Sequence, residues 1–239
     1  MKKALKIIAG VLVAIVFGFA GFVWWALQPR PDPQPLPATL IAVTSPEGQS
    51  LLDDADAFAD YQQLSESFQE QSLRSFCGVA SGVIVLTALG KNVSQDDFFT
   101  DEASRVRSRL SVTFGGMSLP EFAGLVEAHG AQVSTHHADA SSLEKFRQAV
   151  ERNLASEGDY ILVNYQREVL GQQRVGHISP LAAYDRDSDR VLILDTAGYK
   201  YPPTWVPMES LFAAMSTIDS SSGRTRGFIE VSTRSDQTY

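Results

Sequence analysis

The sequence predicts an α+β domain, with helices first and an antiparallel sheet last, preceded by one apolar N-terminal helix. Three observations lead to this expectation. An apolar run opens the chain, helix-start signals with 3.6-residue periodicity fill its middle, and segments rich in β-branched and aromatic residues dominate its last third. This order is typical of a fold with a cleft between a helical part and a sheet.

The 239 residues have room for an N-terminal segment and one catalytic or binding domain, which we expect over 40–239. A composition of 44% hydrophobic and 20% charged residues excludes a disordered or repetitive chain. The formal net charge of −8 argues against a nucleic-acid partner. An acidic domain that handles an anionic small molecule must gather its few positive charges at the binding site.

Residues 1–27 read as a membrane anchor or signal segment, because the run 5–27 contains a single ionised group, Lys6, and is long enough to cross a bilayer as a helix. Trp24 and Trp25 close the run as an interfacial aromatic belt would. Lysines precede the run and none follows it closely. The positive-inside bias therefore predicts a single-pass inner-membrane protein whose domain lies on the periplasmic or extracytoplasmic side.

A cleaved signal peptide is the competing interpretation, but the end of the run offers no small-x-small cleavage site, which favours an uncleaved anchor. Residues 28–39 form a proline-rich linker, and we expect them to be an extended, semi-rigid spacer that holds the domain off the bilayer.

The first strong element of the domain is a buried helix over about 77–89, where small and apolar residues predominate and Gly90 supplies the stop. Capping boxes at Ser118 and Ser141 predict two further helices, which end near Gly130 and Leu154.

Three segments then have strand character, 159–166, 174–184 and 190–197. The polar turn DRDSD joins the last two, so they should form an antiparallel hairpin.

Cys77 is the only cysteine, so the chain can form no internal disulfide. A lone cysteine is more often a core thiol than a reactive one. The predicted position at a helix N-terminus favours the reactive interpretation, because the helix dipole stabilises a thiolate. His177 and Asp195 lie on the two strands of the predicted hairpin, and they share a sheet face in one register but not after a one-residue slip.

Gln71 precedes Cys77 by six residues, where its amide could donate to the oxyanion formed when the thiolate attacks a carbonyl. A solvated loop glutamine is the alternative. The neighbours His136, His137 and Asp139 could suggest a metal site, but adjacent strand residues point to opposite faces, so we expect no metal and place them in a surface loop.

Five segments occur in order over roughly residues 60–230, and together they resemble the phytochelatin synthases, most closely the short bacterial forms: QSLRSFCGVAS, GGMSLPEF, LVNYQR, GQQRVGHISPLAAYDRDSDRVLILD and YKYPPTWV. The resemblance implies a papain-like cysteine protease fold with a Cys-His-Asp triad.

Enzymes of this family are glutathione γ-glutamylcysteinyltransferases. They attack the amide between the cysteinyl and glycyl residues of glutathione, release glycine, and pass the γ-glutamylcysteinyl thioester to water or to another thiol peptide. By position the resemblance implies that Cys77 is the nucleophile, His177 the acid/base, Asp195 the residue that orients the histidine, and Gln71 the oxyanion donor.

The resemblance also implies that Asn164, Gly176 and Arg226 line the acyl site, with Arg226 as a partner for the glutamyl carboxylate. Without the family, Arg226 could equally be a surface charge. No resident cofactor is implied. Heavy-metal ions such as cadmium would enter as metal-thiolate forms of the substrate, in keeping with metal detoxification, and a homodimer is compatible with the sequence.

Two departures from the family pattern favour hydrolysis over phytochelatin polymerisation. The chain has no second cysteine of the kind found in the C-terminal region of the plant enzymes, and Gly198 stands where many relatives carry arginine. Two alternatives remain at this stage: a papain-like peptidase of the leader-processing kind, and a catalytically silent anchored module that binds thiol peptides or metal.

Overall fold

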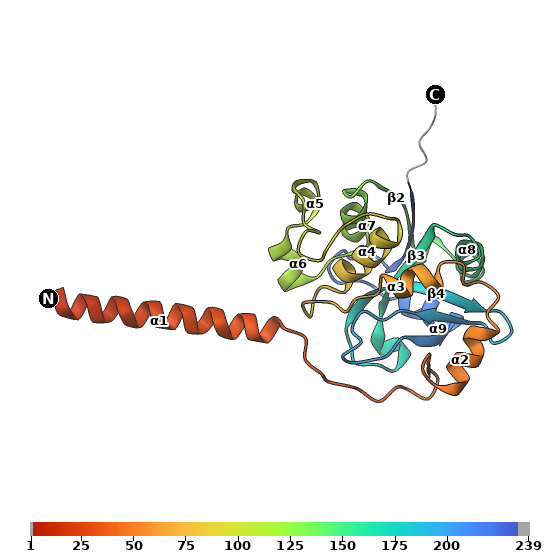
Figure 1. Cartoon of the computed structure of the whole chain (residues 1–239), viewed down its shortest axis with the longest axis horizontal. Coiled ribbons are helices and arrows are strands. Elements are labelled where there is room, and N and C mark those ends of the chain that lie inside the picture. The colour runs from red at the N-terminus through yellow and green to blue at the C-terminus, as the bar shows by residue number, and fades with distance from the viewer. Residues whose placement is uncertain (1, 234–239) are drawn as a thin grey trace, which may run out of the picture.

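The N-terminal helix α1 (Lys2–Leu27) stands clear of the folded domain in the computed structural model, which describes residues 2–233 (Figure 1). Its stretch Gly10–Leu27 has a mean hydropathy of 2.2 and is not buried against the domain. The helix is therefore long and apolar enough to cross a membrane, a property that a signal sequence near the N-terminus would share. Residues 234–239 of the expected 40–239 domain lie outside the described part.

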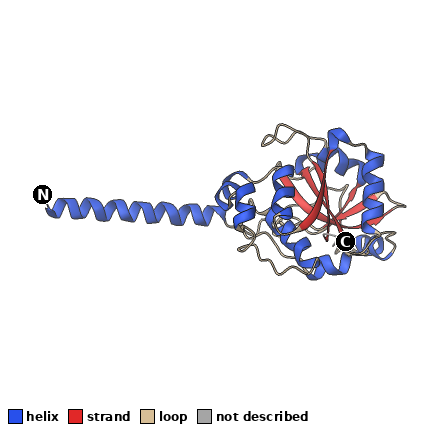
Figure 2. Ribbon diagram, turned by 90° about the horizontal axis from the view of Figure 1, so that it is seen from above, coloured by secondary structure: helices blue, strands red, loops and turns tan. Residues whose placement is uncertain are grey.

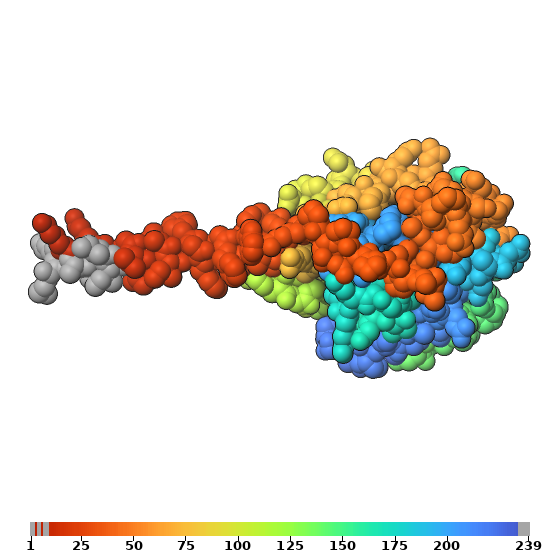
Figure 3. Space-filling view, turned by 90° about the horizontal axis from the view of Figure 1, so that it is seen from below, coloured from red at the N-terminus to blue at the C-terminus, as the bar shows by residue number. Residues whose placement is uncertain are grey.

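The proline-rich segment after α1 runs along the surface of the domain (Figure 3). The backbone N–H of Asp32 donates to Tyr199 O at 3.0 Å, and that of Gln34 donates to Lys200 O at 3.0 Å. The segment was expected to be an extended spacer that holds the domain off the bilayer, but over this stretch it is bonded to the domain itself. Prolines keep the backbone extended, and the non-proline residues between them offer their N–H groups to the neighbouring loop.

Within residues 2–233, seven strands form one sheet in the order β1-β6-β5-β4-β3-β7-β2, and every neighbouring pair is antiparallel. Figure 2 shows these strands in the middle of the domain with helices on both sides. The strands are β1 (Ile41–Ala42), β2 (Ala131–His137), β3 (Asp159–Gln166), β4 (Gly176–Asp185), β5 (Arg190–Ile193), β6 (Thr204–Pro207) and β7 (Gly227–Thr233). The α+β expectation and the three predicted strands are confirmed, except that β5 ends at Ile193 rather than at residue 197.

The helices of the domain lie at both faces and at the edges of the sheet (Figure 1). They are α2 (Pro46–Asp53), α3 (Tyr61–Glu66), α4 (Cys77–Ala88), α5 (Asp101–Val106), α6 (Arg109–Gly115), α7 (Leu119–Glu127), α8 (Leu143–Leu154) and α9 (Met208–Met215), with short 3-10 turns η1 (Ala138–Ala140) and η2 (Arg167–Leu170).

The sheet is buried on both faces, which gives the domain two hydrophobic clusters. Along β3, Leu162 packs with α4 and α7 on one face, whereas Ile161 and Val163 pack with α8 and α9 on the other. A strand that is covered on both sides reads as a continuous apolar run, and DYILVNYQ has this character. Because helices cover both faces of the sheet, we expect a solvent-accessible site where a helix or strand begins or ends.

One helix start was predicted correctly and one was displaced by a residue. Ser118 and Glu121 form the expected capping box of α7. In α8, however, Ser142 is the N-cap and its hydroxyl accepts from Lys145 N at 3.3 Å. The second capping box at Ser141 is therefore wrong, because the Glu144 carboxylate accepts hydrogen bonds from Arg147 and Gln148 instead.

Candidate active site

Cys77 is the first residue of α4, as the sequence predicts. Two features hold the start of this helix close to β4. A Cβ on Gly78 would lie 3.2 Å from Ile178 Cδ1 on β4, so the glycine permits the close approach, and the Ser81 hydroxyl donates to Ile178 O at 2.9 Å. Close packing of these two elements brings the partly buried thiol of Cys77 next to the residue that precedes Ile178, which is His177.

His177 on β4 and Asp195 just after β5 are joined by a hydrogen bond of 3.0 Å from Nε2 to Oδ1. Near the turn, Asp185 pairs with Arg190. If that register continued along the hairpin, the side chains of His177 and Asp195 would point to opposite faces of the sheet. A β-bulge at Ala182 lies between the pairs Leu181–Ile193 and Ala183–Leu192. It shifts the register by one residue, so His177 and Asp195 share a face.

The Asp195 carboxylate is held by more than the histidine. Its Oδ1 also accepts from Arg167 Nη2 at 2.6 Å and from Ala197 N at 2.8 Å. Arg167 follows β3 and is 1% exposed, and its other terminal nitrogen donates to Gln172 at 2.9 Å. Arg167 is the last residue of the motif LVNYQR, but no local pattern in the sequence indicates its role.

Burial and the neighbouring charges set the protonation of these groups. Burial alone would raise the pKa of the Cys77 thiol, but the adjacent His177 imidazolium and its hydrogen bond lower that pKa below the ordinary value. Burial and Arg167 act to lower the pKa of His177, yet Asp195 and the Cys77 thiolate raise it overall. Despite burial, Arg167 and His177 hold the pKa of Asp195 well below its usual range.

A lowered thiol pKa, a raised imidazole pKa and a lowered carboxyl pKa all favour a thiolate–imidazolium pair beside an ionised carboxylate. Asp195 accepts from Nε2–H of His177, so the other ring nitrogen, Nδ1, is left to exchange a proton with Cys77. This assignment of the tautomer follows from the carboxylate being an acceptor only. The arrangement supports nucleophilic attack by sulfur and proton delivery by one imidazole.

Gln71 is buried in the wall of the same pocket. Its Nε2 donates to Leu73 O at 2.9 Å and to Arg74 O at 2.7 Å, so both amide hydrogens hold the loop that leads into α4. The first N–H groups of a helix have no intrahelical acceptor, so the backbone N–H of Cys77 is available for an oxyanion. The role of Gln71 as a second donor stays a prediction.

The three residues expected at the acyl site come together around Arg226. Arg226 Nη1 donates to Asn164 Oδ1 at 2.9 Å and to Asp219 Oδ2 at 3.3 Å. A Cβ on Gly176 would lie 2.8 Å from Arg226 Nη1, so only glycine lets the guanidinium occupy this place. Arg226 is 7% exposed and is therefore not a surface charge.

Two donors of this cluster, Asn164 Nδ2 and Arg226 Nε, are buried and have no protein partner. Buried donors normally have a hydrogen-bond partner, and an unpaired one marks a place where a ligand can bind. Asp219, which the sequence analysis did not single out, adds a carboxylate to the cluster. It could accept from an ammonium group of the same ligand.

Apart from the buried Asp195, these groups line one pocket of about 600 Å³. The thiol and imidazole lie within it, and the charged residues of its lining are Arg30, Arg74, Arg167, Arg174, Lys200 and Arg226 against Asp32 and Asp219. In a chain of net charge −8, this local excess of cations meets the expectation that positive charge gathers at an anion-binding site.

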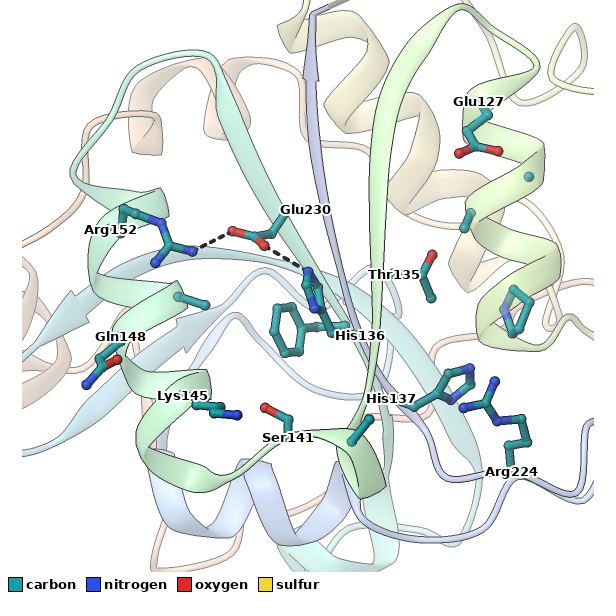
Figure 4. A pocket seen from close by; sticks show the side chains of 16 residues that line it. Glu127, Thr135, His136, His137, Ser141, Lys145, Gln148, Arg152, Arg224 and Glu230 are labelled. Carbon is teal, nitrogen blue, oxygen red and sulfur yellow. Dashed lines mark hydrogen bonds and ion pairs between the residues drawn. The ribbon is translucent and has the colours of Figure 1, made fainter.

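A second hollow of about 780 Å³ lies between α7, β2, α8 and β7 (Figure 4). His136 lies 3.0 Å from Glu230 there, and Arg152 lies 3.2 Å from the same carboxylate. Both His136 and His137 line this hollow from β2, so their placement in a surface loop is wrong. Among the residues that the structure describes, no three histidine, cysteine or acidic side chains form a cluster suited to a metal ion.

Comparison with known proteins gives a consistent result. The chain matches the family model described as Phytochelatin synthase over residues 32–228. It is 34% identical over 203 residues to Glutathione gamma-glutamylcysteinyltransferase 1 of Lotus japonicus, covering 79% of this chain and 39% of the relative. It is 33% identical over 195 residues to Glutathione gamma-glutamylcysteinyltransferase 2 of Arabidopsis thaliana, covering 78% and 43%.

A relative in Schizosaccharomyces pombe, Glutathione gamma-glutamylcysteinyltransferase, is 28% identical over 179 residues, covering 71% of this chain and 42% of the relative. The chain thus spans about two fifths of the length of the curated relatives that it matches.

Proposed function

Because the chain belongs to the phytochelatin synthase family, we propose that it is an enzyme that transfers the γ-glutamylcysteinyl group of glutathione through a thioester on Cys77. The observation that carries this proposal is the Cys77 thiol beside His177, which is hydrogen-bonded to Asp195, at a pocket lined by several cations. A thiolate beside an imidazolium is the combination that acyl transfer through sulfur requires.

In the proposed first step, the Cys77 thiolate attacks the carbonyl carbon of the amide that joins the cysteinyl and glycyl residues. The carbonyl oxygen becomes an oxyanion that the Cys77 N–H stabilises. Gln71 is the proposed second donor, and it would exchange its hydrogen bond to Leu73 O for one to the oxyanion. When the intermediate collapses, the C–N bond breaks and His177 gives its proton to the leaving glycine nitrogen. The γ-glutamylcysteinyl group then remains as a thioester on sulfur.

In the second step, neutral His177 takes a proton from water or from a thiol as that molecule attacks the thioester. The C–S bond breaks and the thiolate–imidazolium pair is restored. Asp195 keeps its charge throughout and orients the ring, and Arg167 keeps Asp195 ionised.

Glutathione carries two carboxylates and one ammonium group, and the pocket has complements for each. We propose that Arg226 and Asn164 bind the α-carboxylate of the glutamyl residue and that Asp219 accepts from its ammonium group. The unpaired donors Asn164 Nδ2 and Arg226 Nε support this assignment. The remaining arginines of the pocket offer partners for the glycyl carboxylate.

We propose further that water is the main acceptor, so hydrolysis exceeds polymerisation. The support is local: position 198 is a glycine that packs against Glu70, so no cationic side chain at this position can hold a second peptide. Cadmium is proposed to act through its thiolate complexes with the substrate. No metal is assigned to the protein itself.

Two structural interpretations belong to the same proposal. A thiol at the N-terminus of a buried helix, facing an antiparallel sheet that supplies the histidine and the acid, supports a papain-like fold. The apolar helix α1 is proposed to be an uncleaved anchor that leaves the domain on the extracytoplasmic side of the inner membrane. Lys2, Lys3 and Lys6 outnumber Arg30, the first cation after the helix.

The full chain in detergent should release glycine from glutathione, and intact-mass measurement should detect the γ-glutamylcysteinyl adduct. Cys77→Ser should abolish both signals. His129→Gln, a change at a histidine that does not line the pocket and whose Nε2 lies 2.9 Å from Phe98 O, should keep them.

Parallel reactions with cadmium and with a dithiol acceptor would measure the balance between hydrolysis and transfer. An absence of both glycine release and adduct would refute the proposal. Cleavage of unrelated peptides without action on glutathione would favour a leader-type peptidase.

A further inference from the structure

The helix α6 presents an apolar face that nothing in residues 2–233 covers. Leu110 and Phe114 are four residues apart on α6 and are 69% and 64% exposed, whereas Val112 on the opposite side is buried. Large apolar side chains scattered singly over a surface are ordinary, but a matched pair on one helix face needs a partner.

The place of α6 in the fold identifies the partner. Arg74 N donates to Leu27 O at 3.1 Å, at the end of α1, and the next residue, Ser75, donates from its hydroxyl to Thr113 O at 2.8 Å on α6. Two consecutive residues therefore connect α6 to the end of the apolar helix. Figures 1 and 3 both show α6 on the side of the domain that faces α1.

We propose that α6 rests on the lipid bilayer through Leu110 and Phe114 and forms a second membrane contact beside α1. This inference depends on the proposed anchoring of the chain by α1. In an anchored chain, Trp24 and Trp25 lie at the membrane interface. Leu27 then ends the span at the headgroup level. Two hydrogen bonds and one peptide step of about 3.8 Å link it to α6, so α6 lies within about 10 Å of that level.

The contact is apolar rather than electrostatic. Arg109, the cation nearest to Leu110 in sequence, is paired with Asp96 at 2.8 Å, and the neighbouring helix α5 begins with two acidic residues. A basic surface for anionic lipids is therefore not what this face offers. An amphipathic helix that inserts its apolar side chains into the interface of a zwitterionic bilayer fits the observations.

The contact would also orient the catalytic pocket. Phe114 and the next two residues, Gly115 and Gly116, belong to the lining of the pocket that contains Cys77. Arg30, three residues after the end of α1, lines the same pocket and lies over the Trp25 ring at 3.4 Å. A domain that rests on α6 therefore opens its pocket at the membrane surface, and its substrates would be peptides that diffuse along that surface.

A site-specific lipid crosslink tests the proposal on the full chain. Leu110 is replaced by p-benzoylphenylalanine, the chain is incorporated into phosphatidylcholine nanodiscs and irradiated, and adducts are identified by mass. Phe58 is the matched control, because it is 47% exposed and its neighbours Ala57 and Ala59 bond to Tyr184 and Leu154 on another part of the domain.

We expect at least about tenfold more lipid adduct at position 110 than at position 58, because transfer of one large apolar side chain from water to an apolar phase is favoured by at least about tenfold. The same probe at position 114 should also react with lipid, and raised salt should not reduce the yield. Equal yields at positions 110 and 58 would overturn the proposed contact. So would the absence of any lipid adduct on a chain that stays in the nanodisc.

A protein–protein adduct at 110 would instead assign the face to a second copy of the chain and would also overturn it. Failure of the chain to stay in the nanodisc would overturn the anchor and the contact together. None of these outcomes depends on turnover of glutathione, so the enzymatic proposal is tested separately.

Discussion

The substitution Arg167→Gln removes the buried cation that holds Asp195. Arg167 is 1% exposed and donates to Asp195 at 2.6 Å, so the change leaves an ionised carboxylate in the core with one charged partner fewer. Breaking a buried ion pair from one side costs about 3–5 kcal/mol. For a domain of this size each kcal/mol lowers the Tm by about 2–4 °C, so the Tm should fall by about 6–20 °C.

The same substitution should change the dependence of stability on pH. The folded pKa of Asp195 lies below its unfolded value, so this group stabilises the fold above the unfolded pKa, and that stability is lost as pH falls through the folded pKa. Without Arg167 the folded pKa of Asp195 rises. Acid unfolding should therefore begin at a higher pH, which thermal melts recorded at several acidic pH values would measure.

Two further variants make this prediction refutable. Arg174→Gln removes another arginine of the same pocket, but its side chain is 79% exposed and its pair with Glu168 is 3.4 Å long, so the Tm should change by less than about 2 °C. Arg167→Lys keeps the charge, so its Tm at acidic pH should fall less than that of Arg167→Gln. If Arg167→Gln melts like Arg174→Gln, the account of Arg167 as the support of Asp195 is wrong.

Three other outcomes are expected. Arg226→Lys should raise the KM for glutathione about tenfold by removing the planar fork, whereas Arg224→Lys, two residues earlier and exposed, should leave it unchanged in initial-rate measurements. Gly176→Ala should also raise KM, because its Cβ would lie 2.8 Å from the Arg226 guanidinium; an unchanged KM would contradict this packing argument. His177→Ala should slow the alkylation of Cys77 by iodoacetamide at pH 7 about tenfold or more, because loss of the imidazolium lets burial raise the thiol pKa; equal rates would show that the helix N-terminus alone maintains the thiolate.

Local patterns in the sequence were sufficient for the elements that carry the site. The apolar run that starts at Cys77 predicts α4, and the segment 159–166 predicts β3, because burial and β-propensity depend on residues close together in the chain. The second capping box failed by one residue because Ser141 and Ser142 are equally suited to cap a helix. The choice between them depends on the preceding turn η1, which ends at Ala140.

The register of the hairpin could not be read from the sequence. The turn alone sets pairs such as Asp185 with Arg190, which would separate His177 from Asp195, and the bulge at Ala182 corrects this. No side-chain pattern marks that bulge, because the surrounding residues are uniformly buried. A signal that depends on alternation is lost where both faces of a strand are covered.

Local sequence patterns were enough to predict that Cys77 begins a helix, that His177 and Asp195 belong to the two arms of one hairpin, and that an apolar helix precedes the domain. The support of Asp195 by Arg167 and the position of α6 near the end of α1 became visible only in the folded chain. Propensity and periodicity report on neighbours along the chain, whereas a buried charge or an uncovered face is defined by segments that meet only when the chain folds.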